Sequence, residues 1–155
     1  MNCWKDSRSS IQGYSEIPDG GNVWQHPDEG LEHHYLWGVA VDPADPNPVI
    51  ISAASSPGKA HGRGDTPGHA ELESFIYRKS GDSPWQRDYE GLPAPEGTFA
   101  TVLATGPTEP HVFYALTKKG LYQSPEAGLS WQSLNVPWHE HYLGQHQQTL
   151  LVVVD

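Results

Sequence analysis

The stretch SPEAGLSWQ at residues 124–132 decides the fold, because two other segments of the chain repeat its pattern. The stretch IPDGGNVWQ at residues 17–25 keeps an acidic residue, a glycine two positions later and the Trp-Gln pair. The stretch RKSGDSPWQ at residues 78–86 keeps a serine, an acidic residue and the Trp-Gln pair. A turn that recurs in this way predicts an array of repeated structural units.

The spacing of the repeat fits a β-propeller blade. The tryptophans of the three turns are 61 and 46 residues apart, and a four-stranded antiparallel blade takes about 40–50 residues. Short apolar runs bounded by Gly and Pro recur in phase with the turns, as expected for strands. The predicted innermost strands are 36–41 and 99–104, the second strands 49–54 and 112–116, and the third strands 74–77 and 120–123.

The composition also indicates an all-β protein. The chain of 155 residues contains 16 Gly and 14 Pro, which favour turns, and six Trp and seven Tyr, which suit short strands. A formal net charge of −10 disfavours nucleic acids and anionic membranes as partners, because both are negatively charged. Cys3 is the single cysteine, so no internal disulfide can form and the redox compartment is not determined. The polar N-terminal segment has no signal-peptide pattern, so the cytoplasm is the default location. We expect no cofactor.

The phase of the repeat divides the chain into blades. Residues 1–31 supply the late strands of one blade, 36–92 a full blade with a loop insertion at 56–73, 99–137 another blade, and 146–155 the first strand of a further blade. The insertion is rich in Gly, Pro and His, so we expect no regular element there. A closed ring needs about four blades or more, whereas this chain supplies about two and a half to three. We therefore expect an incomplete β-propeller, either a segment of a larger ring or a protomer that completes one by self-association.

The repeated turn resembles the Asp-box, S-x-D-x-G-x-T-W, of BNR-repeat β-propellers. The copy at 124–131 has Glu for Asp and Ser for Thr, and the copies at 17–24 and 78–85 depart further. The resemblance covers most of residues 13–155. It implies a superfamily that includes sialidases, xyloglucanases and sortilin-like receptors, and therefore a fold rather than one function. It also implies a structural role for Asp19, Gly21, Trp24, Ser80, Asp82, Trp85, Ser124, Glu126, Gly128, Ser130 and Trp131.

The chemistry of the turn explains these residue types without any ligand. Carboxylates and hydroxyls accept hydrogen bonds from backbone N–H groups of their own turn, and glycine permits a positive φ. We expect all three tryptophans to fold back onto their blades and to be buried. In the resembling families this turn joins the third and fourth strands, away from the catalytic face. Any chemistry is therefore expected at the opposite loops.

The candidates for glycosidase chemistry are few. Sialidases bind the substrate carboxylate with three arginines, because the guanidinium group forms two parallel hydrogen bonds to it. No arginine lies on a predicted innermost strand; the chain has Arg8, Arg63, Arg78 and Arg87. Other glycosidases need two facing carboxylates. Glu32 and Glu140 are the catalytic candidates, since each lies just before a predicted innermost strand.

Histidine and aromatic residues gather before the predicted innermost strands. The candidate ligand-binding set is His33, His34, Tyr35, Trp37, Trp138, His139, His141 and Tyr142. Aromatic faces beside polar groups suit a sugar or a peptide, although packing between blades explains Trp37 equally well. His139 and His141 could hold a metal with His33 or His34 if the loops meet. Their spacing matches no zinc signature, so we assign no metal.

The sequence therefore predicts a non-catalytic binding or scaffold module whose ligand is a carbohydrate or a protein. Its ligand face is built from loops around residues 32–37, 56–74, 96–99 and 138–146. The alternative is a fragment of a sialidase- or xyloglucanase-like glycoside hydrolase whose catalytic residues lie mostly in other blades.

Overall fold

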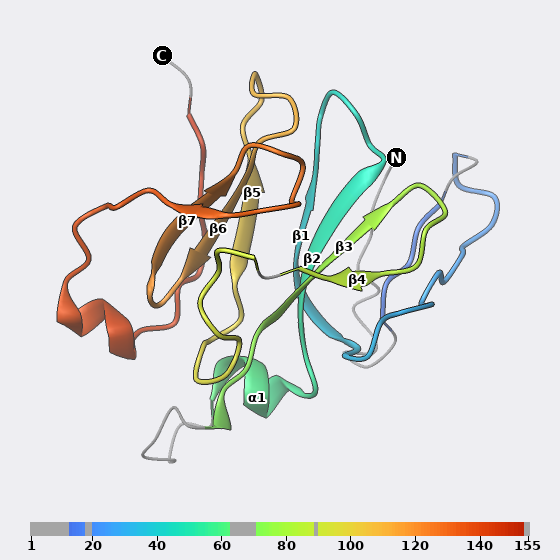
Figure 1. The fold of residues 1–155 in the computed structure, drawn as a ribbon. Coiled ribbons are helices and arrows are strands. Elements are labelled where there is room, and N and C mark those ends of the chain that lie inside the picture. Colours follow the sequence, from blue (N-terminus) through green and yellow to red (C-terminus); the bar gives the residue numbers. More distant parts are fainter. Residues whose placement is uncertain (1–12, 18–19, 63–70, 89, 154–155) are drawn as a thin grey trace.

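The structure, a computed structural model, describes residues 13–17, 20–62, 71–88 and 90–153. It contains two four-stranded antiparallel sheets whose strands pair in chain order (Figure 1). The first sheet holds β1 (Tyr35–Val41), β2 (Pro48–Ala54), β3 (Phe75–Ser80) and β4 (Gln86–Arg87). The second holds β5 (Val102–Thr105), β6 (Phe113–Thr117), β7 (Gly120–Ser124) and β8 (Gln132–Ser133). The prediction of an all-β chain with four-stranded antiparallel blades is confirmed.

Strand β2 forms the centre of the first sheet. All of its residues are buried, and Ile51 pairs with Val39 of β1 on one side and with Tyr77 of β3 on the other. A strand that is covered on both faces has a continuous apolar run rather than alternating polarity. The segment PVIISAA has this composition, which is why it was recognisable as a strand.

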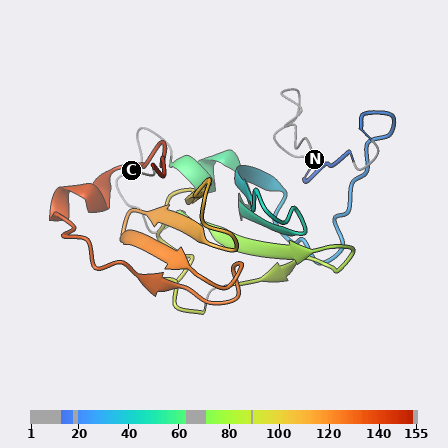
Figure 2. The ribbon, with the colours of Figure 1, turned by 90° about the horizontal axis from the view of Figure 1, so that it is seen from above.

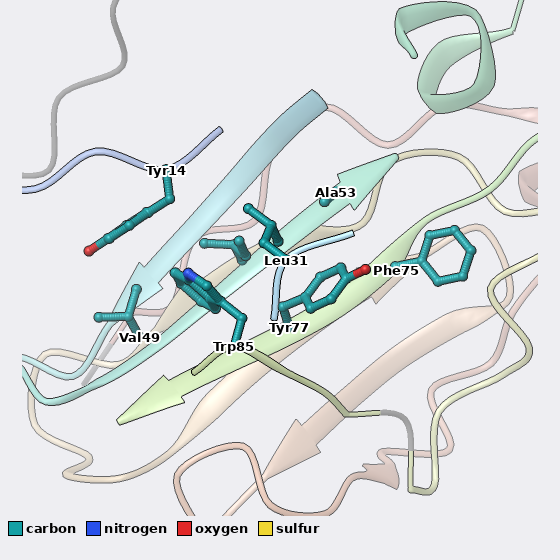
Figure 3. Close-up of a cluster of buried hydrophobic side chains, with 8 residues drawn as sticks. Tyr14, Leu31, Val49, Ala53, Phe75, Tyr77 and Trp85 are labelled. Carbon is teal, nitrogen blue, oxygen red and sulfur yellow. The ribbon is translucent and has the colours of Figure 1, made fainter. Parts of the chain in front are cut away.

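Apolar clusters cover both faces of the first sheet. One cluster lies between the two sheets and includes Ile50, Ile76, Phe113 and Trp131. The other lies on the opposite face, where Tyr14 and Leu31 from the N-terminal segment pack with β2, β3 and Trp85 (Figure 3). Viewed from above, the sheets lie side by side, with the N-terminal segment and the 3-10 helix η2 (Glu140–Gly144) at opposite ends (Figure 2).

The three Trp turns occupy equivalent places. In the two complete sheets the Gln after the Trp pairs with the third strand, as Gln86 with Arg78 and Gln132 with Gln123. An isolated bridge joins Gln25 to Glu16 in the same antiparallel manner. Each turn therefore joins the third and fourth strands of its blade, and the first blade is represented by this bridge among the described residues.

Trp24 departs from the prediction. Trp85 and Trp131 are 3% and 5% exposed, whereas Trp24 is 46% exposed. Each buried tryptophan is covered by the segment that follows the fourth strand of the preceding blade, and the described residues contain no such segment for Trp24. The expectation that all three are buried is wrong for Trp24. Asp19 lies outside the described residues.

The insertion also differs from expectation. A short helix, α1 (Pro57–His61), begins the insertion: the Ser56 side chain accepts from the Lys59 amide, and Pro57 occupies the first turn. Helix N-termini favour a capping serine and a proline in the first turn. These two signals explain why a helix forms despite the high Gly and Pro content of the insertion. Residues 146–153 pair with no other described strand, so their place as the first strand of a further blade stays a prediction. None of the described helices is long and apolar enough to cross a membrane.

Candidate functional site

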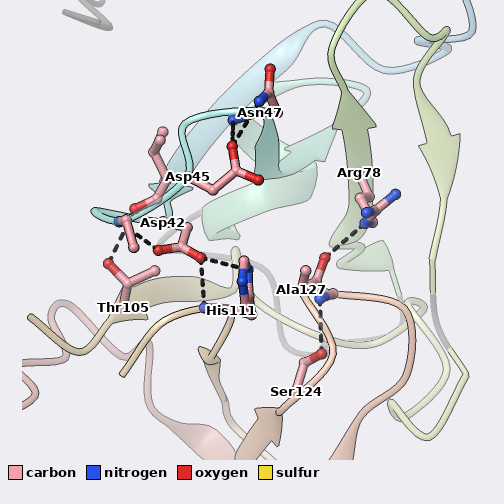
Figure 4. Close-up of polar contacts among 11 residues, drawn as sticks. Asp42, Asp45, Asn47, Arg78, Thr105, His111, Ser124 and Ala127 are labelled. Atoms are coloured by element: carbon pink, nitrogen blue, oxygen red, sulfur yellow. Dashed lines mark hydrogen bonds and ion pairs between the residues drawn. The ribbon is translucent and has the colours of Figure 1, made fainter. Parts of the chain in front are cut away.

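At one end of the sheets, the polar groups of the turns are satisfied internally (Figure 4). Asp42 is 2% exposed and accepts hydrogen bonds from the backbone N–H groups of Ala44 (2.8 Å) and His111 (2.5 Å). Its Oδ2 also lies 3.0 Å from His111 Nδ1. Burial raises the pKa of Asp42, but the backbone hydrogen bonds and the His111 charge outweigh it, so the pKa is lowered. Asp42 therefore ties the β1–β2 turn to the second sheet and has a structural role.

The Trp turn at 124–131 is held in the same way. Ser124 is fully buried, and its Oγ accepts a hydrogen bond from the Gly128 N–H at 2.9 Å. Ser130 donates to the Glu126 carboxylate at 3.1 Å. The Arg78 side chain donates to the Ala127 carbonyl at 2.7 Å, which joins the turn to the neighbouring sheet (Figure 4). The hydroxyl, carboxylate and carbonyl groups of this turn thus form hydrogen bonds within the protein.

The opposite end of the sheets carries a group of rings, which we call the ring cluster: Tyr35, Trp37, His61, Phe99 and His146. Tyr35 and Trp37 begin β1, and His61 ends α1. The His61 ring lies 4.3 Å from Trp37 and 4.8 Å from His146, measured between centroids. Phe99 lies 5.1 Å from His146. Segments that are distant in sequence thus meet beside α1, at the lower end of the sheets in Figure 1.

The polar atoms of the ring cluster form a consistent chain of hydrogen bonds. Tyr35 Oη lies 2.8 Å from His61 Nε2, and His61 Nδ1 lies 2.6 Å from His146 Nε2. His146 Nδ1 lies 2.8 Å from the Gln147 carbonyl. With both imidazoles neutral, the donors of this chain point in one common direction: from Tyr35 toward the Gln147 carbonyl, or from the Gln148 side-chain amide, 2.9 Å from His146 Nδ1, toward Tyr35. Burial raises the pKa of Tyr35, so its hydroxyl keeps its proton.

Lys118 extends the ring cluster toward η2. Its Nζ lies 5.7 Å from the Phe99 ring centroid, and its carbonyl accepts a hydrogen bond from Trp138 Nε1 at 2.6 Å. Burial and then the charge of Lys119 lower the pKa of Lys118. Beyond Trp138 lies the η2 cluster, made of Trp138, His139, His141 and Tyr142, with Tyr142 centroids 5.3 Å from Trp138 and 4.0 Å from His141. We call the two clusters together with Lys118 the ring band.

The predicted ligand-binding residues are divided between separate places. Tyr35 and Trp37 belong to the ring cluster, and Trp138, His139, His141 and Tyr142 form the η2 cluster. His33 instead stacks on Phe75 with 3.9 Å between centroids, and its Nδ1 lies 2.6 Å from the Tyr77 hydroxyl. Burial and then the charge of Arg87 lower the pKa of His33. His34 is exposed outside both clusters.

The catalytic and metal candidates do not converge. Glu32 forms an ion pair with Arg87, and Glu140 begins η2. Figures 1 and 2 both show η2 on the far side of the second sheet from the segment before β1, so these carboxylates do not face each other. Within the described ranges, no group of three or more His, Cys, Asp or Glu could hold a metal ion. His139 and His141 contact each other through Nδ1 atoms 2.7 Å apart, away from His33.

Sequence reasoning missed the residues that connect the ring band. His61 and Phe99 lie in the loops 56–74 and 96–99 that the sequence assigned to the ligand face, but neither was named as a candidate residue, and Lys118 was not singled out. The one available signal was the position of His146 beside the other histidines before the last apolar segment. Nothing in the sequence indicates that His61 reaches it across 85 positions.

No protein-family model matches the chain, and no curated protein sequence matches it. Solved structures do. The GH74 xyloglucanase from Xanthomonas campestris matches with a TM-score of 0.53 and 19% identity over 81% of this chain. An ancestral GH74 enzyme and a GH74 enzyme from Niastella koreensis match with TM-scores of 0.50 and 14% identity, over 83% and 76% of this chain. The chain spans only 18–22% of these proteins' lengths. The matches show that the fold is that of a β-propeller.

Proposed function

We propose that this chain is part of a β-propeller that binds a neutral carbohydrate at the ring band. The observation that carries the proposal is the ring cluster, where side chains from four separate segments meet at the start of β1. Trp37 is 37% exposed and Tyr142 38%, so each offers part of its ring to solvent. Partly exposed rings beside fixed hydroxyl and imidazole groups suit a sugar, which has apolar faces and polar edges.

The charges of the molecule favour a neutral sugar over an anionic one. The chain has a formal net charge of −10, which repels anions. Both arginines in the described ranges are engaged elsewhere: Arg78 donates to the Ala127 carbonyl, and Arg87 pairs with Glu32. They therefore supply no carboxylate-binding group to the ring band, and a sialic acid is disfavoured as its ligand.

Affinity electrophoresis of the chain against soluble polysaccharides tests the proposal. Xyloglucan, galactomannan and mixed-linkage glucan represent neutral ligands, and polygalacturonate represents an anionic one. We expect at least one neutral gel to retard the wild type and the Leu129→Ala variant, whose altered residue is an exposed apolar side chain of a Trp turn. The same gel should not retard Trp37→Ala. Equal retardation of the two variants, or retardation only by polygalacturonate, would contradict the proposal.

A second candidate function is part of a xyloglucan-degrading glycoside hydrolase. It is favoured by the fold match to GH74 enzymes, one of which is described as a xyloglucanase. Release of reducing ends from xyloglucan, lost on Glu32→Gln or Glu140→Gln substitution, would support this candidate. The binding proposal expects no release by the chain, with binding retained in both Gln variants.

We also assign the three Trp turns to the Asp-box type, with a structural role. The assignment is supported by the buried Ser124–Gly128 hydrogen bond, the Ser130–Glu126 hydrogen bond and the positive φ of 85° at Gly128. A Cβ at Gly128 would lie 2.3 Å from Ile50 Cδ1 of the first sheet, so the turn packs directly on its neighbour. These groups serve the fold, and we place ligand binding at the other end of the sheets.

A further inference from the structure

Neighbouring blades contact each other where a Trp turn packs against the linker that follows the fourth strand of the preceding blade. We call each such contact a seam, and the two seams share one backbone hydrogen bond. In the first, Trp85 N–H donates to the Glu29 carbonyl at 2.8 Å, and its indole N–H donates to the Pro27 carbonyl at 2.7 Å. In the second, Trp131 N–H donates to the Glu90 carbonyl at 2.8 Å, whereas its buried indole N–H has no hydrogen-bond partner among the described residues. The accepting residue belongs in both cases to a Glu-Gly-Leu segment that follows the Trp-Gln pair of the preceding blade.

Glycine is required in both segments. Gly30 has φ 84° and Gly91 has φ 85°, a region that residues with a Cβ rarely adopt. A Cβ at Gly30 would lie 2.2 Å from the Trp85 carbonyl oxygen, and one at Gly91 would lie 1.8 Å from that of Trp131. Each seam therefore consists of a buried Trp against a segment with an obligatory glycine, followed by a leucine that packs beside it.

Trp24 lies where the tryptophan of a third seam would lie, and we call this exposed side of the first blade the Trp24 edge. It occupies the same place in its blade as Trp85 and Trp131, since Gln25 pairs with Glu16 as Gln86 pairs with Arg78. Trp24 is 46% exposed, and among the described residues neither its amide nor its indole N–H donates a hydrogen bond. The groups that the seam uses are thus present and uncovered at this edge.

The chain's own last linker does not complement that edge. After Trp131-Gln132 the corresponding linker is two residues shorter than those after Trp24 and Trp85, and it has Asn135 at the positive φ, 51°, in place of glycine. Asn135 has the Cβ that the seam geometry excludes. Val136, which follows it, is 46% exposed, whereas Leu31 in the first seam is 6% exposed. A second copy of this chain is therefore a poor occupant of the Trp24 edge.

We propose that the Trp24 edge is a docking surface for another propeller blade, one whose fourth strand is followed by an acidic residue, a glycine and a leucine. The segment would accept the Trp24 amide N–H at the carbonyl of its acidic residue, as in both seams, and the indole N–H as in the first seam, and place its glycine against the Trp24 carbonyl. The Trp24 edge presents the same groups as the tryptophan side of the two internal seams, so the same kind of segment is expected to cover it. A residue with a Cβ at the glycine position is excluded by the close approach of the Trp carbonyl.

Nuclear magnetic resonance of the intact chain with a synthetic peptide tests the selectivity. The peptide carries residues 26–32 of this chain, HPDEGLE, and its matched control has alanine in place of Gly30. We expect the glycine peptide to shift the amide and indole N–H signals of Trp24 and to leave those of Trp37 in place. Unchanged Trp24 signals, or equal shifts with the alanine peptide, would overturn the proposal.

A linker graft gives a second test in the same chain. Residues 133–136 are replaced by the sequence of residues 87–92, which ends in Glu-Gly-Leu, so the last blade carries the docking segment. Light scattering should show a monomeric wild type, association of the graft, and a monomer again when Trp24→Ala is added to the graft. Trp24-dependent association of the wild type would contradict the glycine criterion, as would a folded graft that stays monomeric.

Discussion

The Trp turns and their seams differ from the ring band in how they are built. The turns repeat one pattern, and their contacts are made largely by backbone groups, such as the Trp85 and Trp131 N–H groups that donate to Glu29 and Glu90. The ring band has no repeat, and its contacts are made by side chains from distant segments, such as His61 and His146. The repeated region therefore sets the fold, and the unrepeated region is where a ligand site can be formed.

The largest expected effect comes from breaking a seam. Gly91→Ala places a Cβ against the Trp131 carbonyl at a φ of 85°, and we expect the free energy of unfolding to fall by roughly 3 kcal/mol or more. Gly81→Ala is the matched control: its φ is 54°, and no atom lies within 4 Å of its added Cβ. We expect it to cost only about 1–2 kcal/mol. Urea unfolding curves measure both, and equal losses would show that the seam contact is unimportant.

A smaller loss is expected inside one turn. Ser124→Ala leaves the Gly128 N–H buried without its acceptor, which should cost about 1–3 kcal/mol. Ser130→Ala removes a hydrogen bond to an exposed carboxylate, and we expect a loss below about 0.5 kcal/mol. Urea unfolding of the pair tests whether the buried hydroxyl is the one that holds the turn. A larger loss in Ser130→Ala would contradict this.

Asp88, in the linker that follows β4, couples the stability of the fold to pH. It lines a pocket with Ser74, Thr101 and Thr117, and burial raises its pKa from 3.8 to about 6. Because the folded state then binds the proton more tightly than the unfolded state, the free energy of unfolding falls as pH rises from about 4 to about 6. Since Asp88 is partly exposed, solvent screening reduces this contribution to about 1 kcal/mol.

The comparison for this prediction is Asp88→Asn, which carries no titratable group at the same position. Its advantage over the wild type should grow between pH 4 and pH 6 and stay constant above, as measured by thermal or urea unfolding. Parallel profiles would show that Asp88 does not titrate in this window.

The sequence made the repeated framework predictable for a physical reason. The turn needs Ser124, Gly128 and Trp131 at fixed spacing, because a buried hydroxyl, a positive φ and a large ring are each tied to one backbone position. Strands such as β2 were recognisable because a strand covered on both faces is apolar throughout. The exposure of Trp24 was not predictable from its motif, since it depends on a neighbouring blade rather than on the turn.

The ring band was predictable only in part. Tyr35 and Trp37 were identified because they precede an apolar strand, and Trp138 with Tyr142 because they cluster in sequence. His61 was not identified, because α1 has to form before its side chain can reach Tyr35 and His146. Contacts of this kind depend on how loops fold back over the sheets, and no local pattern specifies them.

The central claim is that the ring band binds ligand whereas the Trp turns do not, and isothermal titration calorimetry with the polysaccharide that retards the chain tests it most directly. Trp37→Ala should stay folded, with a loss of about 1–3 kcal/mol because its ring is partly buried, and lose the binding heat. Leu129→Ala should keep both the stability and the binding heat. Binding that survives in Trp37→Ala but is lost in Leu129→Ala would contradict the account.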